Sequence, residues 1–135
     1  MLTEKDYCDY DTCVTLKELG YVGSSRYYYT QRDRKFHYDA YNMFYTVRTA
    51  DAMGYVLAVH LYNAQKWLRE EKGIFVYIDV PWKTDDGLGW SYFCCNRPMT
   101  EEDKEVCFAS GGFYDSYEEA LLEGVKASVK ILKKE

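Results

Sequence analysis

The sequence is poor in several features on which common activities depend. It has two prolines and two histidines among 135 residues, and no glycine-rich loop with the lysine that follows it in phosphate-binding sites. It also has no Cys-x-x-Cys or His-Glu-x-x-His pattern. A nucleotide-hydrolysing role therefore has no support and a structural zinc site is disfavoured, so we expect neither a cofactor nor a metal.

Long apolar segments are also missing. The longest uncharged apolar-rich run, 52–65, has fourteen residues, whereas a membrane helix needs about 20. The first twenty residues carry seven charged side chains, a pattern that is not typical of a secretion signal. We therefore expect a cytoplasmic protein that does not act on a membrane.

The cysteines are odd in number and irregularly spaced, which in a cytoplasmic chain favours reduced, partly buried thiols over a disulfide framework. They are Cys8, Cys13, Cys94, Cys95 and Cys107. The thiol of Cys94 or Cys107 beside a histidine would make a nucleophilic site. Because buried, inert cysteine is the commoner outcome, we expect a non-enzymatic protein without catalytic residues, and the Cys-His pair stays open as an alternative.

Length and composition favour one folded domain, residues 1–135. The chain is 47% hydrophobic and 29% charged, which is enough apolar material for one core of this size. Its net charge of −5 disfavours general attraction to duplex DNA or to anionic lipid.

Apolar residues at helical spacing predict three helices. The predicted helices cover about 9–19, 61–72 and 117–132. The last follows a capping box, in which Ser116 precedes Glu119 by three residues. The segment 49–72 fits either one continuous helix or a short strand over 55–59 followed by a helix, and we prefer the strand.

Aromatic and β-branched residues predict the strands. They are expected at about 25–31, 35–40, 43–48, 74–80 and 90–95, with a loop and a short strand over 97–112. Because both faces of 74–80 are apolar, we expect that strand to be central and to end at Pro81. The fold class is therefore α+β: a two-layer sandwich with an antiparallel-rich sheet of four to five strands and about three helices on one face.

Three phrases of the sequence carry a resemblance. They are DYDTCVTLKELGY, LYNAQKWLREEKGIFV and YDSYEEALLEGVKASVKIL, in this order. The chain thereby resembles small uncharacterised proteins of phages and prophage-like mobile elements of gut anaerobic bacteria. The resemblance implies a phage or mobile-element origin and an α+β fold. It does not indicate which activity the protein has.

The most unusual feature is segment 24–50, in which basic residues are interleaved with eight aromatic ones. Five basic against two acidic residues give it a charge of +3, whereas the rest of the chain carries −8. Aromatic faces stack on bases and guanidinium groups hold phosphates, so such a hairpin suits single-stranded nucleic acid or a nucleotide. The alternative is that its tyrosines pack against helices and its arginines pair with acids.

Fifteen tyrosines and three tryptophans exceed what this core can bury with every hydroxyl satisfied. Tyr, Trp and Arg are also the residues enriched at interface hot spots. We therefore expect a tyrosine-rich binding protein that engages a macromolecular partner through the 24–50 hairpin. The partner is a host or phage protein or a single-stranded nucleic acid, and a homodimer is a further possibility. The predicted binding residues are Arg26, Tyr28, Arg32, Arg34, His37 and Trp90.

The alternative function is a small-molecule or nucleotide binder, with or without hydrolytic activity. Its pocket would be formed by Tyr28, Arg34, His37 and Trp90.

Overall fold

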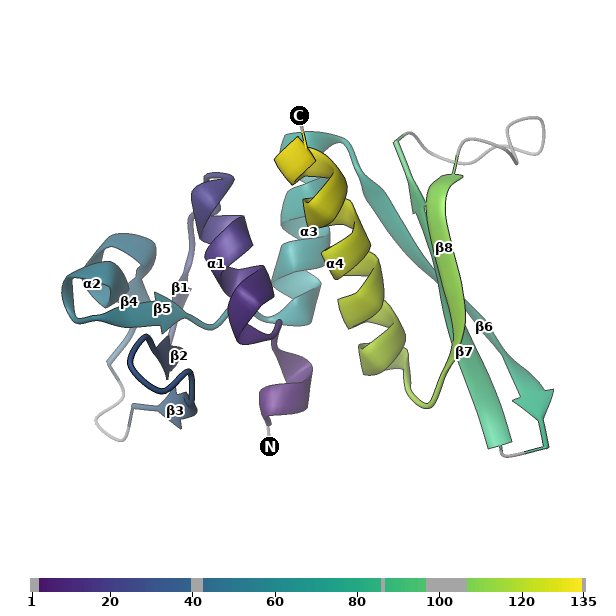
Figure 1. The fold of residues 1–135 in the computed structure, drawn as a ribbon, viewed down its shortest axis with the longest axis horizontal. Coiled ribbons are helices and arrows are strands. Elements are labelled where there is room, and N and C mark those ends of the chain that lie inside the picture. Colours follow the sequence, from purple (N-terminus) through teal and green to yellow (C-terminus); the bar gives the residue numbers. More distant parts are fainter. Residues whose placement is uncertain (1–2, 40–42, 86, 97–106, 135) are drawn as a thin grey trace. The chain divides into compact units, whose positions relative to one another are not determined.

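The computed structural model describes residues 3–39, 43–85, 87–96 and 107–134 (Figure 1). The chain divides into two compact units, Met1–His60 and Leu61–Glu135. Both units combine helices with antiparallel strands, so the α+β class is confirmed. No helix within the described ranges is long and apolar enough to cross a membrane.

The first unit holds two small antiparallel sheets, in the orders β1-β4 and β3-β2-β5. Its elements are the 3-10 turn η1 (Glu4–Asp6), α1 (Tyr10–Glu18), β1 (Ser24–Ser25), β2 (Tyr27–Thr30), β3 (Phe36–Tyr38), β4 (Tyr45–Thr46), α2 (Val47–Ala52) and β5 (Tyr55–Leu57). Helix α1 packs on β5, and α2 packs on β4 and β5.

Helix α1 begins and ends where the sequence predicts. The Asp9 carboxylate accepts a hydrogen bond of 2.9 Å from the backbone nitrogen of Thr12 and so caps the first turn. At the other end Gly20 has φ +99°, and the nitrogen of Tyr21 donates to the carbonyl of Leu16 at 2.9 Å. This is a Schellman ending, which requires a left-handed residue and therefore favours glycine.

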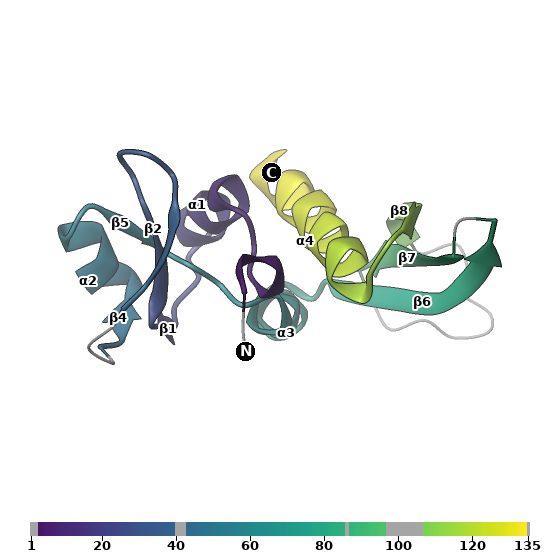
Figure 2. The ribbon, with the colours of Figure 1, turned by 90° about the horizontal axis from the view of Figure 1, so that it is seen from below.

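The second unit is a two-layer arrangement of one sheet and two helices. Its elements are α3 (Leu61–Lys72), β6 (Phe75–Thr84), β7 (Gly87–Cys95), β8 (Cys107–Tyr114) and α4 (Tyr117–Lys134). The strands are antiparallel in the order β6-β7-β8. Helix α4 contacts all three strands and α3 contacts α4 and β6; Figure 2 shows both helices on the same side of this sheet.

The predicted strand followed by a helix in 49–72 is confirmed as β5 and α3. The third strand expected over 43–48 is limited to β4, because the Thr46 hydroxyl accepts from the Thr49 nitrogen at 3.1 Å and starts α2. Among the residues that the structure describes, strand pairing is divided among three small sheets and not concentrated in one sheet of four to five strands.

The predicted central position of 74–80 is wrong, since β6 is an edge strand and β7 lies between β6 and β8. Pro81 does not end the strand either, because β6 continues to Thr84 through a shift of register between Asp79 and Trp82. A proline lacks the N–H of a ladder and is tolerated at an edge or a bulge. In 97–112 the strand begins at Cys107; the predicted loop before it falls outside the described residues.

Helix α4 lies against the sheet at Gly124. A Cβ atom on Gly124 would stand 2.6 Å from Cγ1 of Val76, closer than any ordinary contact. The backbone of α4 therefore approaches β6 at a point where no side chain fits.

We expect Gly124→Ala to destabilise the protein by about 1–2 kcal/mol, because overpacking outweighs the gain in helix propensity. Urea unfolding followed by circular dichroism measures this difference. In a Val76→Ala background, where the space is open, the same substitution should be neutral or stabilising. A stabilising Gly124→Ala in the otherwise unchanged protein would contradict the close approach.

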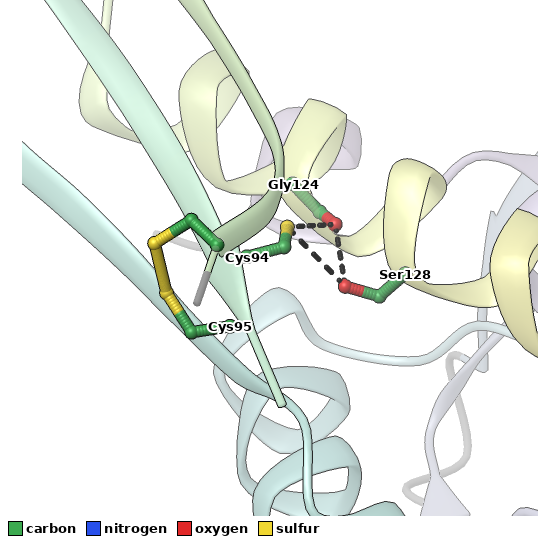
Figure 3. The surroundings of a disulfide bond; sticks show 5 residues. Cys94, Cys95, Gly124 and Ser128 are labelled. Atoms are coloured by element: carbon green, nitrogen blue, oxygen red, sulfur yellow. Dashed lines mark hydrogen bonds between the residues drawn. A yellow bond between two sulfur atoms is a disulfide. The ribbon is translucent and has the colours of Figure 1, made fainter. Parts of the chain in front are cut away.

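The expectation that all cysteines are reduced is wrong for one pair. Cys95 and Cys107 are cross-strand partners of β7 and β8, with Cα atoms 4.1 Å apart, and form a disulfide (Figure 3). Sequence spacing does not show which residues a sheet places opposite one another, so this pairing depends on the fold. The other three cysteines, Cys8, Cys13 and Cys94, are free and buried, as expected.

Reduction of the disulfide should lower the free energy of unfolding by about 2–4 kcal/mol, because the bond restricts the unfolded chain. Urea titrations with and without dithiothreitol measure the loss. The Cys95→Ala/Cys107→Ala variant is the matched control, and its unfolding should not respond to the reductant. An unchanged midpoint of the unaltered protein in reductant would show that the bond contributes nothing.

Candidate functional site

The aromatic residues of the β2–β3 hairpin, residues 27–38, separate onto two faces of the β3-β2-β5 sheet. Successive side chains of a strand point to opposite faces, and the register pairs Tyr29 with Phe36 and Tyr28 with His37. Tyr27 and Tyr29 therefore share one face, and Tyr28 lies on the other.

The first of these faces is part of the core. Tyr29 is 1% exposed, and its hydroxyl donates to the carbonyl of Cys8 at 2.7 Å. The Tyr27 ring lies 4.8 Å from that of buried Tyr7 and 5.4 Å from that of Phe36. This face agrees with the structural alternative, in which tyrosines are used for packing.

The other face carries a half-buried cluster of rings. The Tyr28 ring stacks on Tyr55 at 4.1 Å and on His37 at 5.5 Å, and Tyr45 lies edge-on to Tyr28. The Tyr45 hydroxyl donates to the buried Asp39 carboxylate at 2.7 Å. That hydrogen bond to the carboxylate raises the pKa of Tyr45 to about 12.

Arg26 contacts Tyr38, which pairs with Tyr27 in the strand register. Its guanidinium is 4.7 Å from the centre of the Tyr38 ring and donates to the Tyr38 hydroxyl and to the Asp39 carbonyl. Nε of Arg26 and Nε2 of His37 are buried and have no hydrogen-bond partner in the described structure. Since most buried polar atoms are paired, these two retain unused hydrogen-bonding capacity.

The turn between β2 and β3, residues 31–35, is exposed and basic. Three cations, Arg32, Arg34 and Lys35, surround one acid, Asp33, for a net charge of +2. The Asp33 carboxylate accepts from the Thr30 hydroxyl and from the Lys35 nitrogen, and these hydrogen bonds lower its pKa. We call this segment the basic turn.

The two arginines of the basic turn differ in their contacts. Arg34 has φ 59°, and its guanidinium lies 5.1 Å from the centre of the Tyr10 ring. Arg32 is exposed, and its side chain makes no hydrogen bond, ion pair or ring contact with a described residue. Arg34 is thus held in place, whereas Arg32 is free to bind.

The structure brings only some of the predicted binding residues together. Tyr28 and His37 stack on each other in the ring cluster, whereas Arg26 contacts Tyr38. Arg34 lies against Tyr10, which packs edge-on against Tyr29 of the opposite face. The predicted pocket is therefore not formed by its members in the first unit, because neighbouring strand residues point apart. Trp90 belongs to the second unit, where its ring packs edge-on against Tyr117 at 5.7 Å.

The thiols are poorly suited to nucleophilic catalysis. Cys94 donates to the Gly124 carbonyl at 3.2 Å and lies 3.4 Å from the Ser128 hydroxyl (Figure 3), and burial raises its pKa. Interaction with Cys13 and burial raise the pKa of Cys8 well above its usual range. Cys107 is bonded to Cys95. None of these sulfurs is a ready thiolate at neutral pH.

Metal binding finds no support in the described ranges, where no three side chains of His, Cys, Asp or Glu come together to hold an ion.

A pocket of about 430 Å³ between the end of α1 and the start of α2 was not predicted. Its lining comes from segments near residues 20 and 47, which are distant in sequence and share no motif, so only the fold places them together.

Comparison of the chain with protein-family models, with curated proteins and with solved structures gave no match. Function must therefore be argued from the geometry of the chain itself.

Buried tyrosines should make the protein unfold at alkaline pH. Burial raises the pKa of Tyr7 to about 12, against about 10 in an unfolded chain. The neutral Tyr7 phenol therefore contributes its full share to the free energy of unfolding below pH about 10. This contribution is lost as the pH rises toward 12, because the phenol ionises more readily in the unfolded chain than in the folded one. Urea titrations at about pH 8 and about pH 11 measure this loss.

Tyr7→Phe removes one such phenol and should make the stability less dependent on pH. Tyr77→Phe, which alters an exposed ring, is the control and should leave the pH dependence unchanged. Equal stability of the unaltered protein at both pH values would contradict the argument.

Proposed function

We propose that the protein is a non-enzymatic cytoplasmic binding protein of phage or mobile-element origin, and that its basic turn docks on an acidic surface of a partner protein. The observation that carries this proposal is the set of exposed cations in the turn, Arg32, Arg34 and Lys35, beside a single acid.

The cytoplasmic location has its own readout. In a cytoplasm the Cys95–Cys107 pair would be held reduced, so finding this pair oxidised in cells would contradict a cytoplasmic location.

The charge of the basic turn is not neutralised by other parts of the described structure. The ion pairs between described residues join Lys17 to Asp51 and Lys126 to Glu123, and neither involves the turn. Arg32 has no hydrogen bond or ion pair with a described residue to give up on binding, so its guanidinium can form a bidentate hydrogen bond with a partner carboxylate. The turn is therefore an electropositive point on a chain of net charge −5.

A protein partner fits this surface better than single-stranded nucleic acid. Proteins that hold single strands offer free aromatic faces on which bases stack. Here Tyr27 and Phe36 stack on each other, Tyr28 stacks on Tyr55, and Arg26 lies against the half-exposed ring of Tyr38. Most ring faces of the 27–38 hairpin are thus occupied, whereas the cations of the basic turn are exposed; outside the hairpin, Phe44 keeps a ring that is 67% exposed.

The test is the Arg32→Ala/Arg34→Ala variant. Immobilised protein is incubated with nuclease-treated bacterial lysate, captured proteins are identified by mass spectrometry, and each is purified and titrated against the variants. We expect the affinity to fall at least about tenfold, as for the loss of hot-spot arginines. The melting temperature should fall by less than about 5 °C, since only the Arg34–Tyr10 contact is lost.

Lys130→Ala/Lys133→Ala is the matched control, because it removes the same charge from exposed positions of α4. Equal weakening by both variants would show general charge attraction and would overturn the docking site. Tight binding of a single-stranded oligonucleotide that only the turn variant loses would replace the protein partner with a nucleic acid.

A further inference from the structure

The pocket of about 430 Å³ lies wholly within the first unit. Its lining includes Lys17, Tyr21, Val22, Val47, Arg48 and Asp51. Its volume falls in the range of about 300–1,000 Å³ found for small-molecule sites. Arg32 and Arg34 are not part of the lining, so the pocket is independent of the basic turn.

The walls of the pocket are largely apolar. Tyr21 is buried, and its ring rests on the backbone of Gly23, where a Cβ atom would stand 2.6 Å from the hydroxyl oxygen. Val22 is 78% exposed and Val47 is half-buried. An apolar ligand that covered Val22 and Val47 would remove this surface from water, which favours binding.

One positive charge of the lining is not compensated. Lys17 and Asp51 form an ion pair and cancel each other. Arg48 is exposed and has no partner among the residues that the structure describes. The lining therefore carries a net charge of +1, and its free donor is a guanidinium, which matches the geometry of a carboxylate.

We propose that this pocket binds a small amphipathic carboxylate, with its alkyl chain against Tyr21, Val22 and Val47 and its carboxylate on Arg48. The same chemistry is offered by a free fatty acid of medium length and by the C-terminal apolar residue of a peptide. The apolar contact supplies most of the affinity, and the guanidinium selects the anion over a neutral ligand of equal length.

The experiment is a titration with sodium octanoate, and with 1-octanol as the neutral ligand of equal chain length, followed by amide NMR. We expect octanoate to shift the amide signals of Gly23 and Val47 and to bind more tightly than octanol. Arg48→Ala should weaken octanoate binding by about two- to fivefold, to the level of octanol, as for an exposed ion pair. Arg48→Lys should retain part of the preference.

Arg32→Ala is the matched control, since it removes an equal charge outside the pocket, and its affinity for octanoate should be unchanged. Val47→Trp should fill the cavity and remove binding of both ligands, with folding checked by the spread of the amide spectrum. One apolar dipeptide in two forms then separates the two sources of the carboxylate. The N-acetylated form keeps a free C-terminal carboxylate, and the C-amidated form lacks it. If the N-acetylated form binds more tightly than both the C-amidated form and octanoate, the natural ligand of the pocket is a peptide.

Three results would overturn the proposal. They are the absence of shifts at millimolar octanoate, shifts centred outside the pocket, and equal loss of affinity in Arg32→Ala and Arg48→Ala. Each of these leaves the docking role of the basic turn untouched, so the two proposals fail separately.

Discussion

The packing of aromatic rings against one another is the interaction on which the first unit depends. Its strands are short, and its core is built around tyrosines such as Tyr7 and Tyr29 together with aliphatic side chains from α1 and β5. A tyrosine can be buried in this way only if its hydroxyl finds an acceptor, as Tyr29 finds the Cys8 carbonyl. The half-buried Tyr45 likewise donates to the Asp39 carboxylate. Ring packing thereby occupies most of the aromatic surface of the described β2–β3 hairpin, whereas Phe44, outside the hairpin, stays 67% exposed.

The second unit is held together by different means. Helix α4 reaches the sheet where Gly124 lacks a side chain, and the buried Cys94 thiol and Ser128 hydroxyl are satisfied there by each other and by a helix carbonyl. The strands β7 and β8 are joined by a disulfide as well as by their ladder. In the second unit the close approach of α4 to the sheet thus holds the layers together, as the packing of aromatic rings does in the first unit.

The binding functions proposed for this protein depend on which cationic side chains stay available for a ligand in the folded chain, more than on the total number of cations. Arg26 contacts Tyr38 and Lys17 pairs with Asp51, whereas the guanidinium groups of Arg32 and Arg48 form no ion pair with any residue in the described part of the chain. One of these lies in an exposed turn and the other lines an apolar pocket. The same chemical group is thus offered in two settings, one suited to a charged surface and one to an amphipathic molecule.

The sequence by itself determined the local structure: the helices α1, α3 and α4, the short strand before α3, and the α+β class. These depend on periodicity, capping and glycine stops, which act between residues near one another in the chain. Only the tertiary structure decided that β6 is an edge strand and that Cys95 forms a disulfide with Cys107. It also decided that Tyr28 and Arg34 make contacts on different faces of the sheet, and that Arg48 lines a pocket. These outcomes depend on pairing between distant segments, and no local pattern encodes which segments pair.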